Sequence, residues 1–177
     1  MIGIDEVGRG SLIGEVFACA VYFEDRIQIE VKDSKLLSPV KRLALYNKII
    51  NSPNIKYAVC TASLEEIEKL NILQATMLAM ERAYNKLNIQ CDVKIDGNSK
   101  PKNLSFAECV IKGDQLIPQI SAASIIAKVE RDKKMEDLHQ IIPKYEIHNN
   151  KGYGTKKHFE AIKKFGLSKF HRKGWKY

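Results

Sequence analysis

No stretch of the sequence is apolar for long enough to cross a membrane. The longest apolar runs, VFACAVYF and SAASIIAKV, fall well short of the ~20 residues that a spanning helix needs. The four cysteines are widely spaced and form no CxxC pair, which argues against a zinc site or a disulfide framework. No basic segment followed by an apolar one precedes the first strand-like run. We therefore expect no signal peptide, reduced thiols, and a cytoplasmic protein with no membrane partner.

The composition is that of an ordinary soluble protein with a basic surface. Of 177 residues, 45% are hydrophobic and 28% are charged, which suits one compact domain. The 29 lysines and arginines exceed the 21 acidic residues, so the net charge is +8. This excess favours a polyanionic partner such as nucleic acid, although many basic proteins only solvate their lysines. No motif indicates an obligate oligomer, so we expect a monomer.

Hydrophobic patterns predict an α/β fold in which helices cover one mixed sheet. Apolar alternation and runs predict strands at 1–5, 16–23, 55–62, 92–96 and 104–111. Helix start residues and helical periodicity predict helices at 39–50, 71–88, 118–138 and 155–165, with a polar loop over 143–154. We expect a main domain over 1–142 and a basic, helical C-terminal segment over 143–177 packed on it.

Two adjacent acids, Asp5 and Glu6, end the first predicted strand. Neighbouring side chains on a regular strand point to opposite faces, so both acids serve one site only if the strand stops or bends there. Gly8 and Gly10 supply the freedom for such a bend. The pair alone predicts either a metal-binding edge or a solvated acidic turn.

Two further acids stand at similar boundaries. Asp96 ends an apolar strand just before Gly97, and Asp114 follows Gly113. Each alone suits an ordinary turn. Brought together with Asp5 and Glu6 by a mixed sheet, they would repel one another unless cations neutralised them. Oxygen ligands suit magnesium or manganese rather than zinc, and a pair of such ions can drive phosphodiester hydrolysis.

The motifs in this order resemble the ribonuclease HII family. GIDEVGRGSLIGEV resembles its DEAGRG signature, and further matches are VKDSKLLSP, LNILQATMLAMERA, KIDGN, KGDQLIPQISAASIIAKVERD, GYGTKKHFEAI and FHRKGW. The resemblance covers nearly the whole chain. It implies a ribonuclease H-like fold, a five-stranded mixed sheet flanked by helices with a small helical C-terminal part. It also implies cleavage of RNA in RNA–DNA hybrids and at ribonucleotides embedded in duplex DNA, giving 3′-hydroxyl and 5′-phosphate ends.

The resemblance also assigns roles to individual residues. It places the catalytic and metal-binding acids at Asp5, Glu6, Asp96 and Asp114, with Asp5 bridging two Mn²⁺ or Mg²⁺ ions. It places Gly8, Arg9 and Gly10 at the ribonucleotide, where backbone groups contact the 2′-hydroxyl that separates RNA from DNA. Tyr153, in GYGT, resembles the tyrosine that stacks on the sugar of the next, deoxy, nucleotide.

Other residues are candidates for substrate binding on weaker grounds. Lys35, in VKDSK, is predicted to support a phosphate-binding edge, with a local turn as an equal alternative. Arg172 lies in a basic and aromatic tail that is the best candidate for holding a duplex without reading its sequence. Ser124 is expected to have a structural role, with support of the site as the alternative. Arg131 is expected on a solvated face, and His158 and His171 at the surface or in packing, with phosphate contact as the alternative.

The chain departs from the family pattern at Val7, Ser11, Glu15 and Leu36, none of which removes a catalytic group. Two alternative functions stay open. A ribonuclease HIII-like nuclease would carry an extra N-terminal domain and a glutamate at the last acidic position, where this chain has Asp114. A catalytically silent hybrid-binding module would bind the duplex without nicking it.

Overall fold

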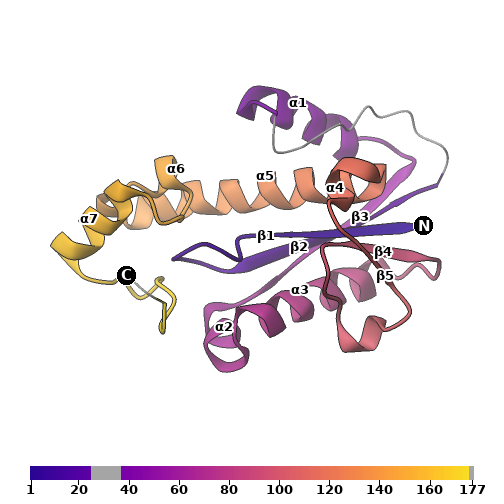
Figure 1. Cartoon of the computed structure of the whole chain (residues 1–177). Coiled ribbons are helices and arrows are strands. Elements are labelled where there is room, and N and C mark those ends of the chain that lie inside the picture. Colours follow the sequence, from indigo (N-terminus) through magenta and orange to yellow (C-terminus); the bar gives the residue numbers. More distant parts are fainter. Residues whose placement is uncertain (25–36, 176–177) are drawn as a thin grey trace.

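The structure, a computed structural model, describes residues 1–24 and 37–175 and contains one five-stranded mixed sheet (Figure 1). The strands lie in the order β3-β2-β1-β4-β5. β1 pairs antiparallel with β2, and β2 with β3, whereas β4 is parallel to both β1 and β5. The strand bounds are β1 Ile2–Val7, β2 Val16–Phe23, β3 Ile55–Ala62, β4 Val93–Asp96 and β5 Glu108–Val110. The predicted fold class is confirmed.

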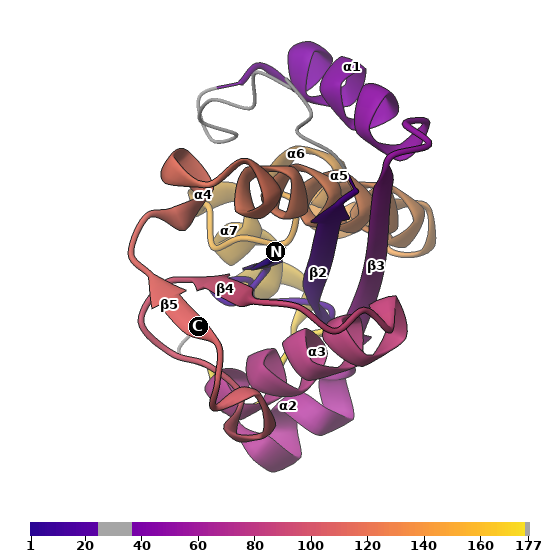
Figure 2. The ribbon, with the colours of Figure 1, turned by 90° about the vertical axis from the view of Figure 1, so that its right-hand side faces the viewer.

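Helices cover both faces of the sheet (Figure 2). The long helix α5 (Pro118–Ile141) packs on β1 and β2, with α1 (Pro39–Ile50) beside it. Helix α3 (Ile72–Leu87), with α2 (Leu64–Leu70) next to it, covers the opposite face. The short helical elements are η1 (Lys102–Leu104), α4 (Gly113–Leu116), η2 (Pro143–Tyr145), α6 (Ile147–Asn150) and α7 (Lys156–Phe165). None of the helices in the described ranges is long and apolar enough to span a membrane.

Strand β2 is apolar throughout because both of its faces are buried. Its side chains alternate between two hydrophobic clusters, as the two-residue period of a strand requires. Val16, Ala18 and Ala20 join the cluster under α3. The side chains on the other face, Cys19, Val21 and Phe23, join the cluster under α5 and α1. The continuous run VFACAVYF therefore marks a central strand.

A glycine allows α5 to begin directly on the central strand. A Cβ atom at Gly3 would lie 2.4 Å from the backbone of Gln119, so only glycine fits at this contact. Asp5 follows two residues later on the same face of β1. The close approach therefore sets the carboxylate of Asp5 against α5, where Ser124 forms a hydrogen bond with it.

The C-terminal part packs on the second half of α5 and on the loop after β1. A third hydrophobic cluster joins these three regions and contains Leu12, Ile13, Met135, Leu138, Tyr145, Ile147 and Ile162. The predicted polar loop over 143–154 was partly wrong, since it contains η2 and α6. Their apolar residues Tyr145 and Ile147 are buried in the cluster.

Three other elements differ from the prediction, one of them the short helix α4, which begins at Gly113 where no helix was expected. Strand β5 is confined to Glu108–Val110 because the preceding residues form η1, which buries Leu104. Helix α2 was missed, although the residues that cap its N-terminus can be recognised in the sequence. Ser63 and Glu66 form a capping box, each side chain accepting a hydrogen bond from the backbone of the other.

Candidate active site

The acidic residues gather where the pairing of the two central parallel strands ends. β1 pairs with β4 only up to Ile4 and Ile95. The expectation that β1 itself stops or bends at Asp5 and Glu6 was wrong, because β1 continues beside β2 to Val7. The edge of β1 that faces β4 therefore loses its strand partner at the acidic pair.

A pocket of about 400 Å³ opens at this point. Of the predicted residues, those lining it are Asp5, Glu6, Gly8, Arg9, Asp96 and Tyr153. They come from the end of β1 and its following loop, the end of β4, and the segment after α6. The fold thus brings together residues that are up to about 150 positions apart in the chain.

Asp5 is the electrostatic centre of the pocket. Its side chain is buried, and its pKa is raised well above the ordinary value, first by desolvation and then by the nearby charges of Glu6 and Asp96. Hydrogen bonds from Ser124 and from the Glu6 amide, 2.7 Å from Asp5 Oδ1, oppose this shift. Burial also raises the pKa of Glu6, against the ion pair with Arg9 at 3.4 Å.

Asp96 and Asp114 are linked through the start of α4. The Gly113 amide donates a hydrogen bond of 2.7 Å to Asp96 Oδ1, which orients this carboxylate. Asp114 is the next residue, and it is buried but is not among the residues that line the pocket. The backbone carbonyl of Asp114 accepts a hydrogen bond from the hydroxyl of Ser121. Asp114 therefore lies one residue from the contact that holds Asp96.

The carboxylates fit a divalent cation by charge and by ligand type. Buried like charges raise one another's pKa, and a cation relieves that repulsion. Within the described ranges, no three acidic, histidine or cysteine side chains form a group that could hold a metal ion. Mg²⁺ is commonly bound by one or two carboxylates together with water and substrate phosphates. The pocket therefore suits an ion whose ligand shell the substrate completes.

A buried arginine of α5 supports the loop after β1, residues 8–15. Arg131 of α5 was expected on a solvated face, but it is fully buried. Its guanidinium donates hydrogen bonds to Ser11 Oγ at 2.7 Å and to the Lys151 carbonyl at 3.0 Å. It also lies 5.0 Å from the ring centre of Tyr153. Gly8 has φ +95°, and a Cβ there would lie 2.5 Å from Arg131 Nε, so the loop requires glycine at this position.

Arg172 occupies a different position from the one predicted. It is fully buried, and its guanidinium donates hydrogen bonds to the backbone carbonyls of Arg9, Ser11, Gly14 and Glu15 at 2.8–3.1 Å. The prediction of direct substrate contact is therefore corrected, because the side chain is enclosed and its donors are engaged by the loop. Gly10 is exposed on that loop and does not line the pocket, and Lys35 lies outside the described residues.

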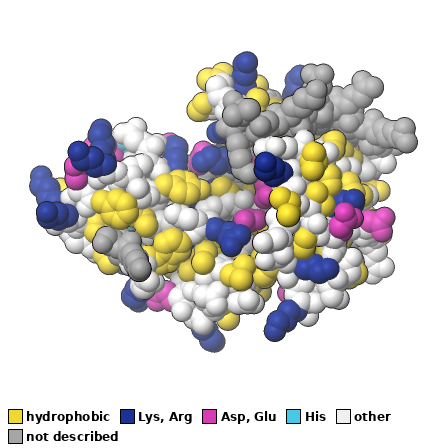
Figure 3. All heavy atoms as spheres, in the orientation of Figure 1, with side chains coloured by type: hydrophobic (Ala, Val, Ile, Leu, Met, Phe, Trp, Pro, Cys, Tyr) yellow, Lys and Arg dark blue, Asp and Glu magenta, His cyan; other side chains and the backbone are white. Residues whose placement is uncertain are grey.

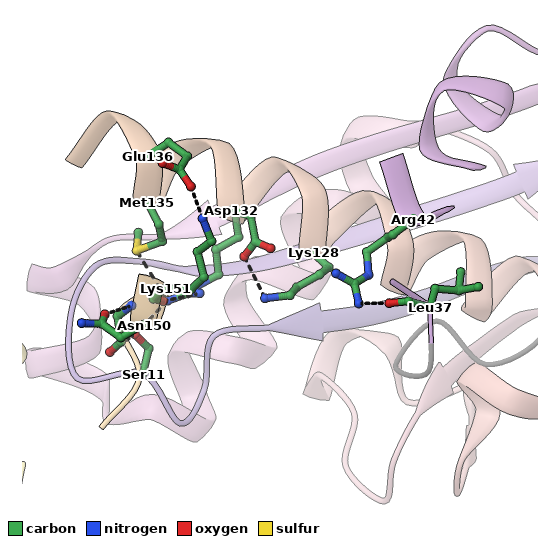
Figure 4. A network of polar contacts seen from close by, with 11 residues as sticks. Ser11, Leu37, Arg42, Lys128, Asp132, Met135, Glu136, Asn150 and Lys151 are labelled. Atoms are coloured by element: carbon green, nitrogen blue, oxygen red, sulfur yellow. Dashed lines mark hydrogen bonds and ion pairs between the residues drawn. The ribbon is translucent and has the colours of Figure 1, made fainter. Parts of the chain in front are cut away.

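Sequence reasoning did not place Arg42 or Lys128 in the pocket, and it favoured a structural role for Ser124, which also lines it. Figure 4 shows Arg42 and Lys128, whose side chains are oriented by the Leu37 carbonyl and by Asp132. Lys128 follows Ser124 by four residues, so the two share a face of α5. This spacing could have identified Lys128. The position of Arg42 depends on how α1 packs, which no local pattern encodes.

The basic tail is only partly available to a duplex. Lysines and arginines gather at the end of the molecule formed by α6 and α7 (Figure 3). Among the exposed lysines of α7 and the tail are Lys163, Lys164, Lys169 and Lys173, the last of which forms an ion pair with Glu68 of α2. His158 and His171 are buried, which agrees with the expectation of packing.

A five-stranded mixed sheet with carboxylates at the ends of its two central parallel strands defines a ribonuclease H-like nuclease. Comparison with known proteins gives the particular family. The family model described as "Ribonuclease HII" matches residues 2–177. The chain belongs to the ribonuclease HII family and is accordingly a ribonuclease H-type endonuclease.

Relatives and solved structures agree with this assignment. Ribonuclease HII of Pelagibacter ubique is 53% identical, covering 98% of this chain and 94% of its own. The protein of the same name from Ehrlichia chaffeensis is 47% identical, with 97% and 83% covered. The ribonuclease HII in the PCNA complex from Archaeoglobus fulgidus superposes with a TM-score of 0.81 at 25% identity, covering 99% of this chain and 95% of that one. Ribonuclease H2 of Pyrococcus horikoshii gives 0.79 at 28% identity, covering 99% and 93%.

Proposed function

We propose that this chain hydrolyses the RNA strand of RNA–DNA hybrids and nicks duplex DNA at embedded ribonucleotides, leaving 3′-hydroxyl and 5′-phosphate ends. One observation carries the proposal: buried Asp5 faces Glu6 and Asp96 in a pocket that Arg9 and Lys128 also line. Carboxylates suit divalent cations, and cationic side chains suit the phosphates of a duplex. The pocket therefore combines the groups that phosphodiester hydrolysis needs.

The proposed metal ligands are Asp5, Glu6, Asp96 and Asp114, holding Mn²⁺ or Mg²⁺. When bound, a pair of these ions supplies an activated water and stabilises the leaving oxygen. The protein orients the carboxylates in advance: Ser124 and the Glu6 amide hold Asp5, and the Gly113 amide holds Asp96. Such orientation reduces the reorganisation needed when substrate binds.

Recognition of the ribonucleotide is proposed to depend on the loop after β1 and on Tyr153. Backbone groups of Gly8, Arg9 and Gly10 would contact the 2′-hydroxyl, and the Tyr153 ring would stack on the next sugar. Arg131 supports this assignment because it contacts both the loop and the tyrosine ring. The proposal includes a monomer acting in the cytoplasm, where the free thiols of all four cysteines are the usual state.

The nicking assay uses duplexes that differ only in one sugar. We expect the protein with Mn²⁺ to nick a duplex containing a single ribonucleotide on its 5′ side, and to leave the all-DNA duplex intact. Mapping both product ends checks the chemistry. Cleavage of a continuous hybrid alone would favour the HIII-like alternative. Binding with no nick at any metal concentration would favour the silent module.

Divalent cations should stabilise the protein through the acidic pocket. We expect saturating Mn²⁺ or Mg²⁺ at neutral pH to raise the melting temperature by several degrees, since ~100 Kd of ligand adds about 2.7 kcal/mol. The Asp96→Asn variant should show a much smaller rise, measured by calorimetry in chelator-treated buffer. The exposed Asp92, at the other end of β4, provides the control, and Asp92→Asn should respond as the wild type does. Equal rises in the wild type and Asp96→Asn would contradict the proposed ligand set.

A further inference from the structure

Two buried histidines connect the C-terminal tail to Tyr153. His158 lies on α7, and His171 lies in the tail that follows it. Their Nε2 atoms are 3.2 Å apart. His158 Nδ1 lies 2.9 Å from the Tyr153 carbonyl oxygen, and His171 Nδ1 accepts a hydrogen bond of 2.9 Å from the Ser168 amide.

These contacts determine where each ring carries its proton. Because His171 Nδ1 accepts from an amide, the proton of this neutral ring is on Nε2. His171 Nε2–H then donates to His158 Nε2, which leaves the proton of His158 on Nδ1, where it donates to the Tyr153 carbonyl. Burial lowers the pKa of both rings, that of His171 to about 4, so both are neutral at neutral pH. The hydrogen bonds thus run in one direction, from the tail to Tyr153.

The pair is packed into a junction between the tail, the loop after β1 and Tyr153. The ring of Tyr145 packs edge-on against His171 with centroids 4.8 Å apart. The tail pairs with the loop after β1 through an Ile13–His171 bridge, and the same loop pairs with Tyr153 through Ser11. The carbonyl of Tyr153 thus has two partners, His158 Nδ1 and the Thr155 amide, each at 2.9 Å, while the Tyr153 ring lies against the Arg131 guanidinium.

We propose that His158, oriented by His171, is a positioning residue that sets Tyr153 in the pocket and so determines how strongly the enzyme prefers a ribonucleotide followed by a deoxynucleotide. This inference rests on the proposed role of Tyr153. His158 has no contact with the substrate in this assignment. It acts through the backbone of Tyr153.

The central measurement is the ratio of kcat/KM on a duplex with one embedded ribonucleotide to that on a continuous RNA–DNA hybrid. His158→Phe keeps a ring but removes both hydrogen bonds, and we expect it to lower the ratio about tenfold. His158→Asn keeps a donor near the position of Nδ1 and should recover most of the loss. The control is the half-buried His139, whose ring contacts His148 near the start of α6. His139→Phe should leave the ratio unchanged.

A double-mutant cycle separates positioning from general stability. With Tyr153→Ala already present, His158→Phe should no longer change the ratio, although it should still lower the melting temperature. An equal fall in the ratio with and without Tyr153 would overturn the inference. If Tyr153→Ala itself leaves the ratio unchanged, the proposed role of Tyr153 fails and this inference fails with it.

A second measurement needs no variant. Nitrogen NMR of the wild-type protein at neutral pH should show His158 protonated at Nδ1 and His171 at Nε2. The opposite tautomer at His158 would remove its donor to Tyr153 and overturn the inference, whatever the stability of the substituted proteins.

Discussion

Asp5→Asn is expected to lower the rate of RNA cleavage on the order of 10³-fold or more, the scale of losing a group that acts in the transition state. The variant keeps the size of the side chain and one acceptor oxygen, which can still accept from the Glu6 amide, but it removes the negative charge and replaces the second oxygen by an NH2 group. It should therefore still bind a hybrid duplex while losing cation-dependent hydrolysis. Single-turnover cleavage and duplex binding, measured on the same preparation, check both statements.

The same substitution should make the metal-free protein more stable at neutral pH. The folded-state pKa of Asp5 is raised by burial and by Glu6 and Asp96. A raised pKa means that this group favours folding below its unfolded pKa of about 3.9 and that this contribution is lost as pH rises through the folded value. At neutral pH the wild type is therefore destabilised either by burying the charged carboxylate or by keeping it protonated, and Asp5→Asn is destabilised by neither.

Melting temperatures of the two proteins, followed from about pH 4 to pH 8 with chelator present, measure this effect. The curves should converge at low pH and separate as pH rises, with Asp5→Asn higher. Asp92→Asn, which removes an exposed carboxylate, should follow the wild type. A lower melting temperature for Asp5→Asn at neutral pH would show that the charge is stabilising and that the pocket does not strain the fold.

Arg172→Ala is expected to destabilise the protein by about 3–5 kcal/mol, a loss of about 10–15 °C in melting temperature for a chain of this size. The buried guanidinium satisfies backbone carbonyls throughout the loop after β1. Without the guanidinium, these buried carbonyl oxygens lose their hydrogen-bond donors in a site that water does not reach. Arg172→Lys should recover only part of the loss, because an ammonium group lacks the planar fork that reaches several carbonyls.

The neighbouring Lys173 provides a matched control for this experiment. It is exposed and forms a surface ion pair with Glu68 at 3.1 Å. Lys173→Ala should change the free energy of unfolding by less than about 1 kcal/mol. Chemical denaturation of both variants checks the comparison. Similar values for the two would mean that the loop holds its shape without Arg172.

Local patterns predicted most of the fold because its elements carry their own start and stop residues. Ser38 caps α1 and Pro39 begins it, as expected. The run VFACAVYF is the buried strand β2. Helix α2 was missed although the capping residues Ser63 and Glu66 are a local signal, whereas the short β5 depends on the packing of Leu104, which lies beyond a local pattern.

Residue type and position in an element pointed to part of the pocket, and the family resemblance added Gly8, Arg9 and Tyr153. Asp5, Glu6 and Asp96 lie near the ends of predicted strands beside glycines, and that pattern offered a shared metal site as one of two interpretations. Arg131 and Arg172 were misjudged because charged residues are seldom fully buried, and nothing near them in the sequence indicates the carbonyls that accept their hydrogen bonds.

Amino-acid order alone determined most of the helices and strands, the burial of both sheet faces, and the identity of the acids at the edge of the sheet. Side-chain period, capping residues and glycine breaks act over a few neighbours, so they can be deduced from the chain itself. Tertiary structure decided that β1 extends beyond the residues that pair with β4. It placed two buried arginines where they support the loop after β1. It also decided that Tyr153 is tied to a pair of histidines. These features join segments distant in sequence, and only the closing of the fold brings their atoms within bonding distance.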